Sequence, residues 1–154
     1  MSNISDLLDP GCIRLELGTH LKEAVIKELV QLLAKAGKLK DDTIDRYVEE
    51  VMGREKISST GIGKGIAIPH VLVTEVSEIM MAVGRSVKGV PFNSVDGKPA
   101  HLIFLIIGPQ GQNNEYLKIL SKLSRYLNDR TFFETLMKIE DPAEVVELVK
   151  ERER

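Results

Sequence analysis

The chain has 154 residues, of which 43% are hydrophobic and 29% charged, a composition typical of a globular domain with its own hydrophobic core. Its 21 Lys and Arg against 23 Asp and Glu give a formal net charge of −2, which argues against a nucleic-acid-binding protein. We find no apolar run of about 18 residues that would form a transmembrane helix, and no basic cluster of the kind that begins a signal peptide. The single cysteine, Cys12, cannot form an internal disulfide or a cysteine-based zinc site. We therefore expect one cytoplasmic domain spanning residues 1–154.

The first part of the chain predicts one strand and two helices. Residues 12–17 alternate apolar and polar side chains, as a half-buried strand does. Apolar residues then recur at helical spacing over 21–36, with Thr19 as the candidate N-cap and Gly37 as the candidate C′ residue. A second amphipathic helix is predicted over 41–53.

The rest of the chain also contains both predicted strands and predicted helices. Strands are predicted over 65–69, 78–85 and 102–107, and helices over 112–128, 131–138 and 142–152. The run 102–107 is wholly apolar, which predicts a central strand covered on both faces. The last helix begins with Asp141 and Pro142, a strong start signal, and residues 150–154 are expected to fray. This alternation predicts the α/β fold class.

A glycine-rich segment lies between the second helix and the next strand. Residues 57–65 (ISSTGIGKG) contain three glycines and three hydroxyl residues in nine positions, which predicts an ordered loop or strand edge. The segment lacks the spacing of a P-loop, and a dinucleotide fingerprint would need Gly where Ile66 stands. Two interpretations stay open: a turn whose glycines allow unusual φ values, or a loop whose backbone N–H groups cradle an anion.

The three histidines, His20, His70 and His101, lack the spacing of a helical metal-binding motif. His20 and His101 fit structural or surface roles. His70 follows Pro69 at the end of a short apolar segment beside the glycine-rich loop, and reactive groups in α/β folds lie at such strand ends. A neutral imidazole, with a reference pKa of about 6.5, is available as a nucleophile near pH 7. The alternative is a turn histidine exposed to water.

Arg54 precedes His70 by 16 positions. Phosphoryl transfer depends mainly on positioning and on neutralising the charge of the phosphoryl oxygens. The planar, paired donors of arginine suit that task. The competing interpretation is that Arg54 and Glu55 form a surface ion pair.

The run from Arg54 to His70 (REKISSTGIGKGIAIPH) closely resembles the active-site signature of IIA domains of the fructose/mannitol class, type 2, in the bacterial phosphoenolpyruvate-dependent sugar phosphotransferase system. Ile4–Leu8 resembles the opening of the nitrogen-regulatory branch, and 95–105 and 117–124 are similar to later segments of the family. The resemblance covers essentially the whole chain. It implies a three-layer α/β/α sandwich with a mixed central sheet.

The resemblance also implies an activity and partners. His70 would accept a phosphoryl group from HPr or its nitrogen-branch paralogue and pass it to a IIB domain, with Arg54 stabilising the phosphoryl oxygens. The alternative is a free-standing regulatory IIA protein that controls target proteins through its phosphorylation state. Neither version needs a cofactor, a metal ion or nucleic acid, and contact with a membrane transporter would be peripheral at most. A histidine-dependent hydrolase is a third and weaker interpretation, because no carboxylate that would orient the imidazole is identifiable.

Other residues of the expected site follow from the same resemblance. Phosphate-binding or site-lining roles are implied for Ser59, Thr60, Gly61 and Tyr116. Tyr116 stands where many members of the family have a second histidine, and its neutral hydroxyl supplies a hydrogen bond without a positive charge. The expected docking rim for partner proteins consists of Ile62, Lys64, Val71 and Leu72. Val71 is a second departure, because a small residue often follows the histidine in this family.

Overall fold

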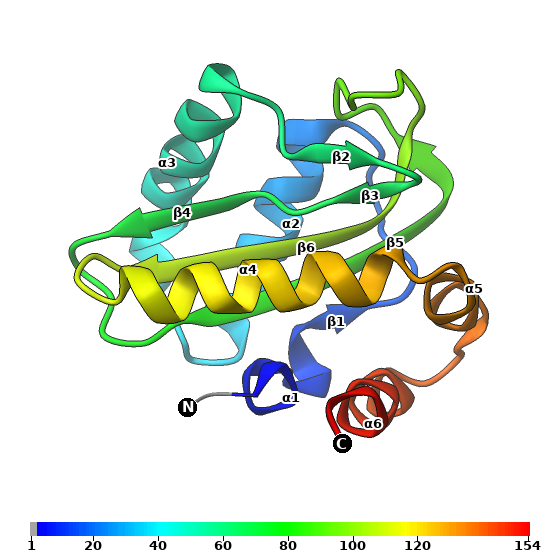
Figure 1. The fold of residues 1–154 in the computed structure, drawn as a ribbon. Coiled ribbons are helices and arrows are strands. Elements are labelled where there is room, and N and C mark those ends of the chain that lie inside the picture. The colour runs from blue at the N-terminus through cyan, green and yellow to red at the C-terminus, as the bar shows by residue number, and fades with distance from the viewer. Residues whose placement is uncertain (1–2) are drawn as a thin grey trace.

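The computed structural model describes residues 3–154, which form a single mixed sheet of six strands with helices on both of its faces (Figure 1). The strands are β1 (Ile13–Arg14), β2 (Gly61–Gly63), β3 (Ile66–Ala67), β4 (His70–Val73), β5 (Met80–Val90) and β6 (Ala100–Pro109). The helices are α1 (Ile4–Leu7), α2 (Lys22–Lys35), α3 (Ile44–Ile57), α4 (Asn113–Asn128), α5 (Arg130–Lys138) and α6 (Pro142–Glu153). Short 3₁₀ turns over Pro10–Cys12 and Asp41–Thr43 precede β1 and α3.

Strand β6 lies at the centre of the sheet, as its apolar sequence predicts. One edge of β6 pairs antiparallel with β5, which pairs in parallel with β1. The other edge pairs in parallel with two short strands in succession, β3 and then β4, with His70 opposite Ile106. Strand β2 adds to β3 as an antiparallel edge strand. The mixed central sheet is therefore confirmed.

Two apolar clusters lie on opposite faces of this sheet. Because side chains alternate along a strand, Ile103 and Leu105 of β6 enter one cluster with residues of α2 and α3, whereas Leu102 and Phe104 enter the other with residues of α4, α5 and α6. Figure 1 shows α4 lying across one face of the sheet and α2 behind the other. The three-layer α/β/α architecture is confirmed.

Helix α2 begins later than its sequence predicts. It starts at Lys22, and Leu21 at its N-cap is 70% exposed instead of buried. The Thr19 hydroxyl donates to Glu28 at 3.1 Å, so the prediction of Thr19 as the N-cap was wrong. Gly37 has φ +80°, the left-handed conformation expected of a C′ glycine.

Helix α3 continues past Gly53, where the sequence predicts its end, and stops at Ile57. Gly53 lowers helix stability by about 1 kcal/mol relative to alanine. Tertiary contacts of the last turn outweigh this cost, since Glu55 is buried there. The extension places Arg54 on the helix and not in a loop.

His70 lies at the start of β4, so the prediction that it ends the preceding strand was wrong. Pro69 has no N–H to donate, and regular strand structure is interrupted between Ala67 and His70. The edge nevertheless continues, because Ile106 N donates to Pro69 O at 3.0 Å. The imidazole is therefore held midway along an edge of β6.

Helices α1 and α6 lie side by side (Figure 1). The Glu153 carboxylate accepts hydrogen bonds from Ile4 N at 2.6 Å, Ser5 N at 3.2 Å and the Ser5 hydroxyl at 2.7 Å. The chain is helical through Glu153, where the sequence predicted fraying, because helix α1, which the sequence reading missed, packs against α6. In the described part of the chain, 3–154, no helix has the length and apolar character needed to cross a membrane.

Candidate functional site

The imidazole of His70 is half-buried and held by one hydrogen bond. Its Nδ1 lies 2.6 Å from the backbone oxygen of Ile68. Because a carbonyl oxygen only accepts, Nδ1 carries the proton and the lone pair belongs to Nε2. Nε2 is therefore the nucleophilic nitrogen of this ring.

The surroundings of His70 keep the ring neutral. Burial lowers the pKa of His70 below its ordinary 6.5, and the Arg54 cation lowers it further. The bond to Ile68 and the negative charge of Glu55 raise the pKa but do not outweigh these two effects. The free-base form, which has the nucleophilic lone pair, is therefore the main form near pH 7.

Arg54 extends from the last turn of α3, and its Nη1 donates to Ser58 O at 3.0 Å. Burial raises the pKa of Tyr116 and lowers that of His70, and the charge of Arg54 acts on both groups in addition, so the guanidinium lies within electrostatic reach of both rings. The remaining guanidinium donors suit an anion held beside His70. The competing interpretation of an Arg54–Glu55 surface ion pair was wrong, because Glu55 turns inward.

Glu55 is the centre of a buried polar network that the sequence reading missed. Its carboxylate accepts from Lys22 Nζ at 2.9 Å, from Thr60 N at 3.2 Å and from the Thr60 hydroxyl. Lys22 Nζ also lies 4.8 Å from the centroid of the Phe92 ring. The network ties α2, the end of α3 and the glycine-rich loop together. No sequence signal indicates it, since Lys22 and Glu55 are 33 positions apart.

The glycine-rich loop is fixed by its own hydroxyl groups. The Ser59 hydroxyl donates to Phe92 O and accepts from Gly61 N at 3.0 Å, while Thr60 N and the Thr60 hydroxyl bind Glu55. These groups are paired inside the protein, so the geometry gives Ser59, Thr60 and Gly61 a structural role instead of the expected phosphate-binding one. A side chain at Gly61 would place its Cβ against the Ser94 hydroxyl and 3.0 Å from Ser94 Cα, so only glycine fits there.

Tyr116, in the first turn of α4, lies next to His70. The two ring centroids are 5.8 Å apart and the ring planes meet at 58°. The tyrosine is only 5% exposed, and its hydroxyl is buried without a hydrogen-bond partner in the described residues 3–154. Burial raises the pKa of the Tyr116 phenol, so the hydroxyl stays protonated at neutral pH. His70 of β4 and Tyr116 of α4 thus lie side by side, and the charge of Arg54 on α3 acts on both.

The residues of the expected docking rim separate into two groups. Ile62 is 45% exposed, and Val71 and Leu72 are half-buried beside His70. Lys64 is bonded through Nζ to Asn128 Oδ1 at 2.8 Å, at the far end of α4. With a rise of 1.5 Å per residue, Asn128 lies about 18 Å along the helix from Tyr116. Lys64 is therefore not brought to the His70 site.

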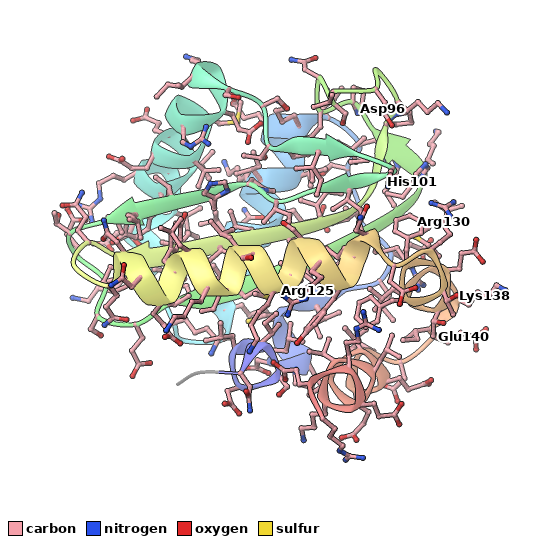
Figure 2. All side chains as sticks on the ribbon, viewed as in Figure 1. Asp96, His101, Arg125, Arg130, Lys138 and Glu140 are labelled. Carbon is pink, nitrogen blue, oxygen red and sulfur yellow. The ribbon has the colours of Figure 1, made fainter. Side chains whose placement is uncertain are left out.

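The other two histidines lie away from this site, near one serine of β5. His20 Nδ1 is 3.3 Å from the Ser86 hydroxyl, and His101 Nδ1 donates to Ser86 O at 2.8 Å. Figure 2 shows His101 and Asp96 at the end of the sheet opposite the start of α4. Among residues 3–154, no group of three His, Cys, Asp or Glu side chains could hold a metal ion. These contacts fit the structural roles predicted for His20 and His101.

The chain is similar to one protein family along nearly its whole length. The sequence model of the family "Phosphoenolpyruvate-dependent sugar phosphotransferase system, EIIA 2" matches residues 6–152. The "PTS system fructose-specific EIIABC component" of Bacillus subtilis (strain 168) is 40% identical over 151 residues, covering 98% of this chain and 24% of that protein. The chain therefore spans about a quarter of that relative's length.

Solved structures give the same relationship. The "Nitrogen Regulatory Protein IIA-Ntr from Neisseria meningitidis" superposes with a TM-score of 0.87 at 32% identity, covering 95% of this chain and 98% of that one. A chain in the "Complex of enzyme IIAMTL and phosphorylated enzyme IIBMTL from Escherichia coli" superposes with a TM-score of 0.77 at 25% identity, covering 94% and 98%. Similarity thus extends to sugar-specific and to nitrogen-regulatory proteins.

Proposed function

The chain belongs to the EIIA 2 family of the phosphoenolpyruvate-dependent sugar phosphotransferase system, and from this premise we propose that it is a phosphocarrier that receives and releases a phosphoryl group on His70. The observation that carries the proposal is the free Nε2 of a neutral, half-buried imidazole whose Nδ1–H is bonded to Ile68 O. The nearby Arg54 guanidinium supplies the positive charge that a phosphoryl group needs.

The proposed transfer is a direct displacement at phosphorus. The Nε2 lone pair attacks the phosphorus of a phosphohistidine on the donor protein, for which we propose HPr or its nitrogen-branch paralogue. As the Nε2–P bond forms, the donor's N–P bond breaks and its electron pair returns to the donor nitrogen. Nδ1 keeps its proton, shared with Ile68 O, so the phosphorylated ring is cationic. A cationic ring is a good leaving group for the next transfer.

Arg54 acts on the phosphoryl oxygens, whose negative charge it partly neutralises throughout the transfer. The buried Glu55 network fixes the turn of α3 that carries Arg54 and the loop that follows it. Positioning of this kind supplies most of the catalysis in phosphoryl transfer, where the protein itself makes few covalent bonds.

For the recipient we propose the cysteine thiolate of a IIB domain, which would dock on the apolar residues Ile62, Val71 and Leu72. The solved complex of IIAMTL with phosphorylated IIBMTL supports an acceptor of this kind. The second candidate is a regulatory IIA protein whose phosphorylation state controls target proteins, and the similarity to IIA-Ntr favours it. In that case the added charge on His70 changes the docking surface.

The test is incubation with phosphoenolpyruvate, enzyme I and HPr, followed by intact-mass measurement. The wild type is expected to gain one phosphoryl group and His70→Ala none, whereas the matched control His101→Ala is phosphorylated as the wild type is. Phosphorylation of His70→Ala, or failure of the wild type with HPr and its paralogue alike, would refute the proposal. Adding a IIB domain then separates the two candidates, because only a transport component loses its phosphoryl group to IIB.

A further inference from the structure

A buried hydroxyl without a partner lies at the edge of the proposed site. Tyr116 is 95% buried by residue, and within residues 3–154 its hydroxyl makes no hydrogen bond. Burying an unpaired polar group is unfavourable, and native proteins pair nearly all of them. Such a hydroxyl is available to a partner that is present in only one state of the protein.

The position of Tyr116 indicates which group that partner is. Its ring contacts the His70 ring, with centroids 5.8 Å apart. The side chain is seated on β6, where a Cβ at Gly108 would come within 3.2 Å of Tyr116 Cδ1. Both rings also lie in the field of the same Arg54 cation. A phosphoryl group on His70 would bring oxygen acceptors beside the Tyr116 ring, which contacts the imidazole.

Building on the proposed function, we infer that the Tyr116 hydroxyl donates a hydrogen bond to a phosphoryl oxygen on His70, and so gains its partner only in the phosphorylated protein. No proton is transferred in this contact. The phenol remains neutral, so it orients the phosphoryl group without adding charge to that of Arg54. The same side chain is thus unfavourable before phosphorylation and favourable after it.

This dual role predicts opposite effects of one substitution in the two states. Tyr116→Phe removes the unpaired hydroxyl and keeps the ring, so the unphosphorylated protein should melt at the same or a higher temperature than the wild type. The phosphorylated form loses a hydrogen bond to a charged group, which is worth about a factor of ten in an equilibrium constant. A purely structural tyrosine would lose stability equally in both forms.

The experiment measures the equilibrium of phosphoryl exchange between HPr, or whichever donor phosphorylates the wild type, and this protein. Wild type, Tyr116→Phe and Tyr126→Phe are mixed with the phosphorylated donor, and the phosphorylated fractions are read by intact mass. Tyr126 is a matched control, since it is a buried tyrosine of the same helix, α4, packed on Phe132 away from His70. We expect about a tenfold lower equilibrium constant for Tyr116→Phe and no change for Tyr126→Phe. Melting temperatures of each form complete the comparison.

Two results would overturn the inference. One is an exchange equilibrium for Tyr116→Phe that matches Tyr126→Phe. The other is an equal loss of melting temperature by the phosphorylated and unphosphorylated forms of Tyr116→Phe. Failure of the proposed function is separate, because the wild type itself would then remain unphosphorylated in the same assay.

Discussion

The glycine-rich loop and the neighbouring edge of the sheet differ in how many of their polar groups are hydrogen-bonded within the protein. In the loop, the hydroxyls of Ser59 and Thr60 and the N–H groups of Thr60 and Gly61 are paired within the protein. At the edge, within residues 3–154, the Tyr116 hydroxyl is unpaired and His70 is hydrogen-bonded only through Nδ1. The polar groups that hold the loop backbone have their hydrogen-bond partners within the protein. The Tyr116 hydroxyl and Nε2 of His70, which are proposed to bind the phosphoryl group, do not. The loop therefore supports the site without contributing the donors that its sequence suggested.

The largest effect on stability is expected from removing Glu55, the centre of the buried network that holds the glycine-rich loop. Glu55→Ala removes a carboxylate that is 2% exposed at its side chain and leaves Lys22 and the Thr60 groups without their partner. Loss of one member of a buried ion pair costs about 3 kcal/mol or more. The free energy of unfolding, measured by urea denaturation, should fall by about that amount.

The control for this change is Glu134→Ala. Glu134 and Arg130 form an exposed ion pair, with side chains 56% and 66% exposed, whose loss is expected to cost at most about 0.5 kcal/mol. Equal effects of Glu55→Ala and Glu134→Ala would mean that the buried network does not hold the loop.

The next largest effect is expected at the sheet edge that carries His70, where the rate of phosphorylation tests the role of Arg54. Arg54→Gln removes the cation proposed to neutralise the phosphoryl oxygens, so the rate of His70 phosphorylation should fall about 100-fold. Stability should change little, because among the described residues the Arg54 side chain makes one hydrogen bond, an exposed one to Ser58 O. The measurement is rapid quenching followed by intact mass. Arg46→Gln, on the exposed side of the same helix, should transfer normally, and an equal loss there would point to general charge steering.

Arg54→Gln should also change the pH dependence of the phosphorylation rate. Burial and Arg54 lower the pKa of His70 below its ordinary value, so the wild-type phosphorylation rate should decline at a lower pH than it would with an unperturbed histidine. In Arg54→Gln one of the two lowering effects is gone, so the pKa of His70 should rise and the decline should begin at higher pH. NMR titration of the ring checks the pKa directly. An unchanged pKa would place Arg54 too far from His70 to act on it.

The smallest effect on stability is expected at Asp96, whose carboxylate binds the turn between β2 and β3. Backbone N–H groups of Lys64 and Lys98 donate to the Asp96 carboxylate and lower its pKa from 3.8. A lowered carboxyl pKa stabilises the fold above the unfolded value and loses this effect as the pH falls through the folded value. Asp96→Asn should therefore melt slightly below the wild type at neutral pH, with a difference that shrinks below about pH 4. A difference independent of pH would show that the charge is not involved.

Much of the fold could be predicted because the relevant signals are local. The wholly apolar run at 102–107 becomes the buried central strand β6, and helical spacing over 112–128 becomes α4. Asp141 caps α6 by accepting from Ala143 N, as its place before Pro142 predicts. The run from Arg54 to His70 was enough to indicate the family, which the family match confirms.

Contacts between distant segments control how individual polar groups are used. Periodicity reports which face of an element is apolar, but Glu55 is buried because Lys22, 33 positions away, meets it there. The buried Glu55 stabilises the turn of α3 that follows Gly53. Its carboxylate also accepts from the Thr60 N–H, a donor that the family resemblance assigned to phosphate binding. The residue pattern and the family resemblance together predict the layers and the candidate nucleophile. Which donors stay free around that nucleophile depends on contacts between distant segments, and no local pattern encodes those contacts.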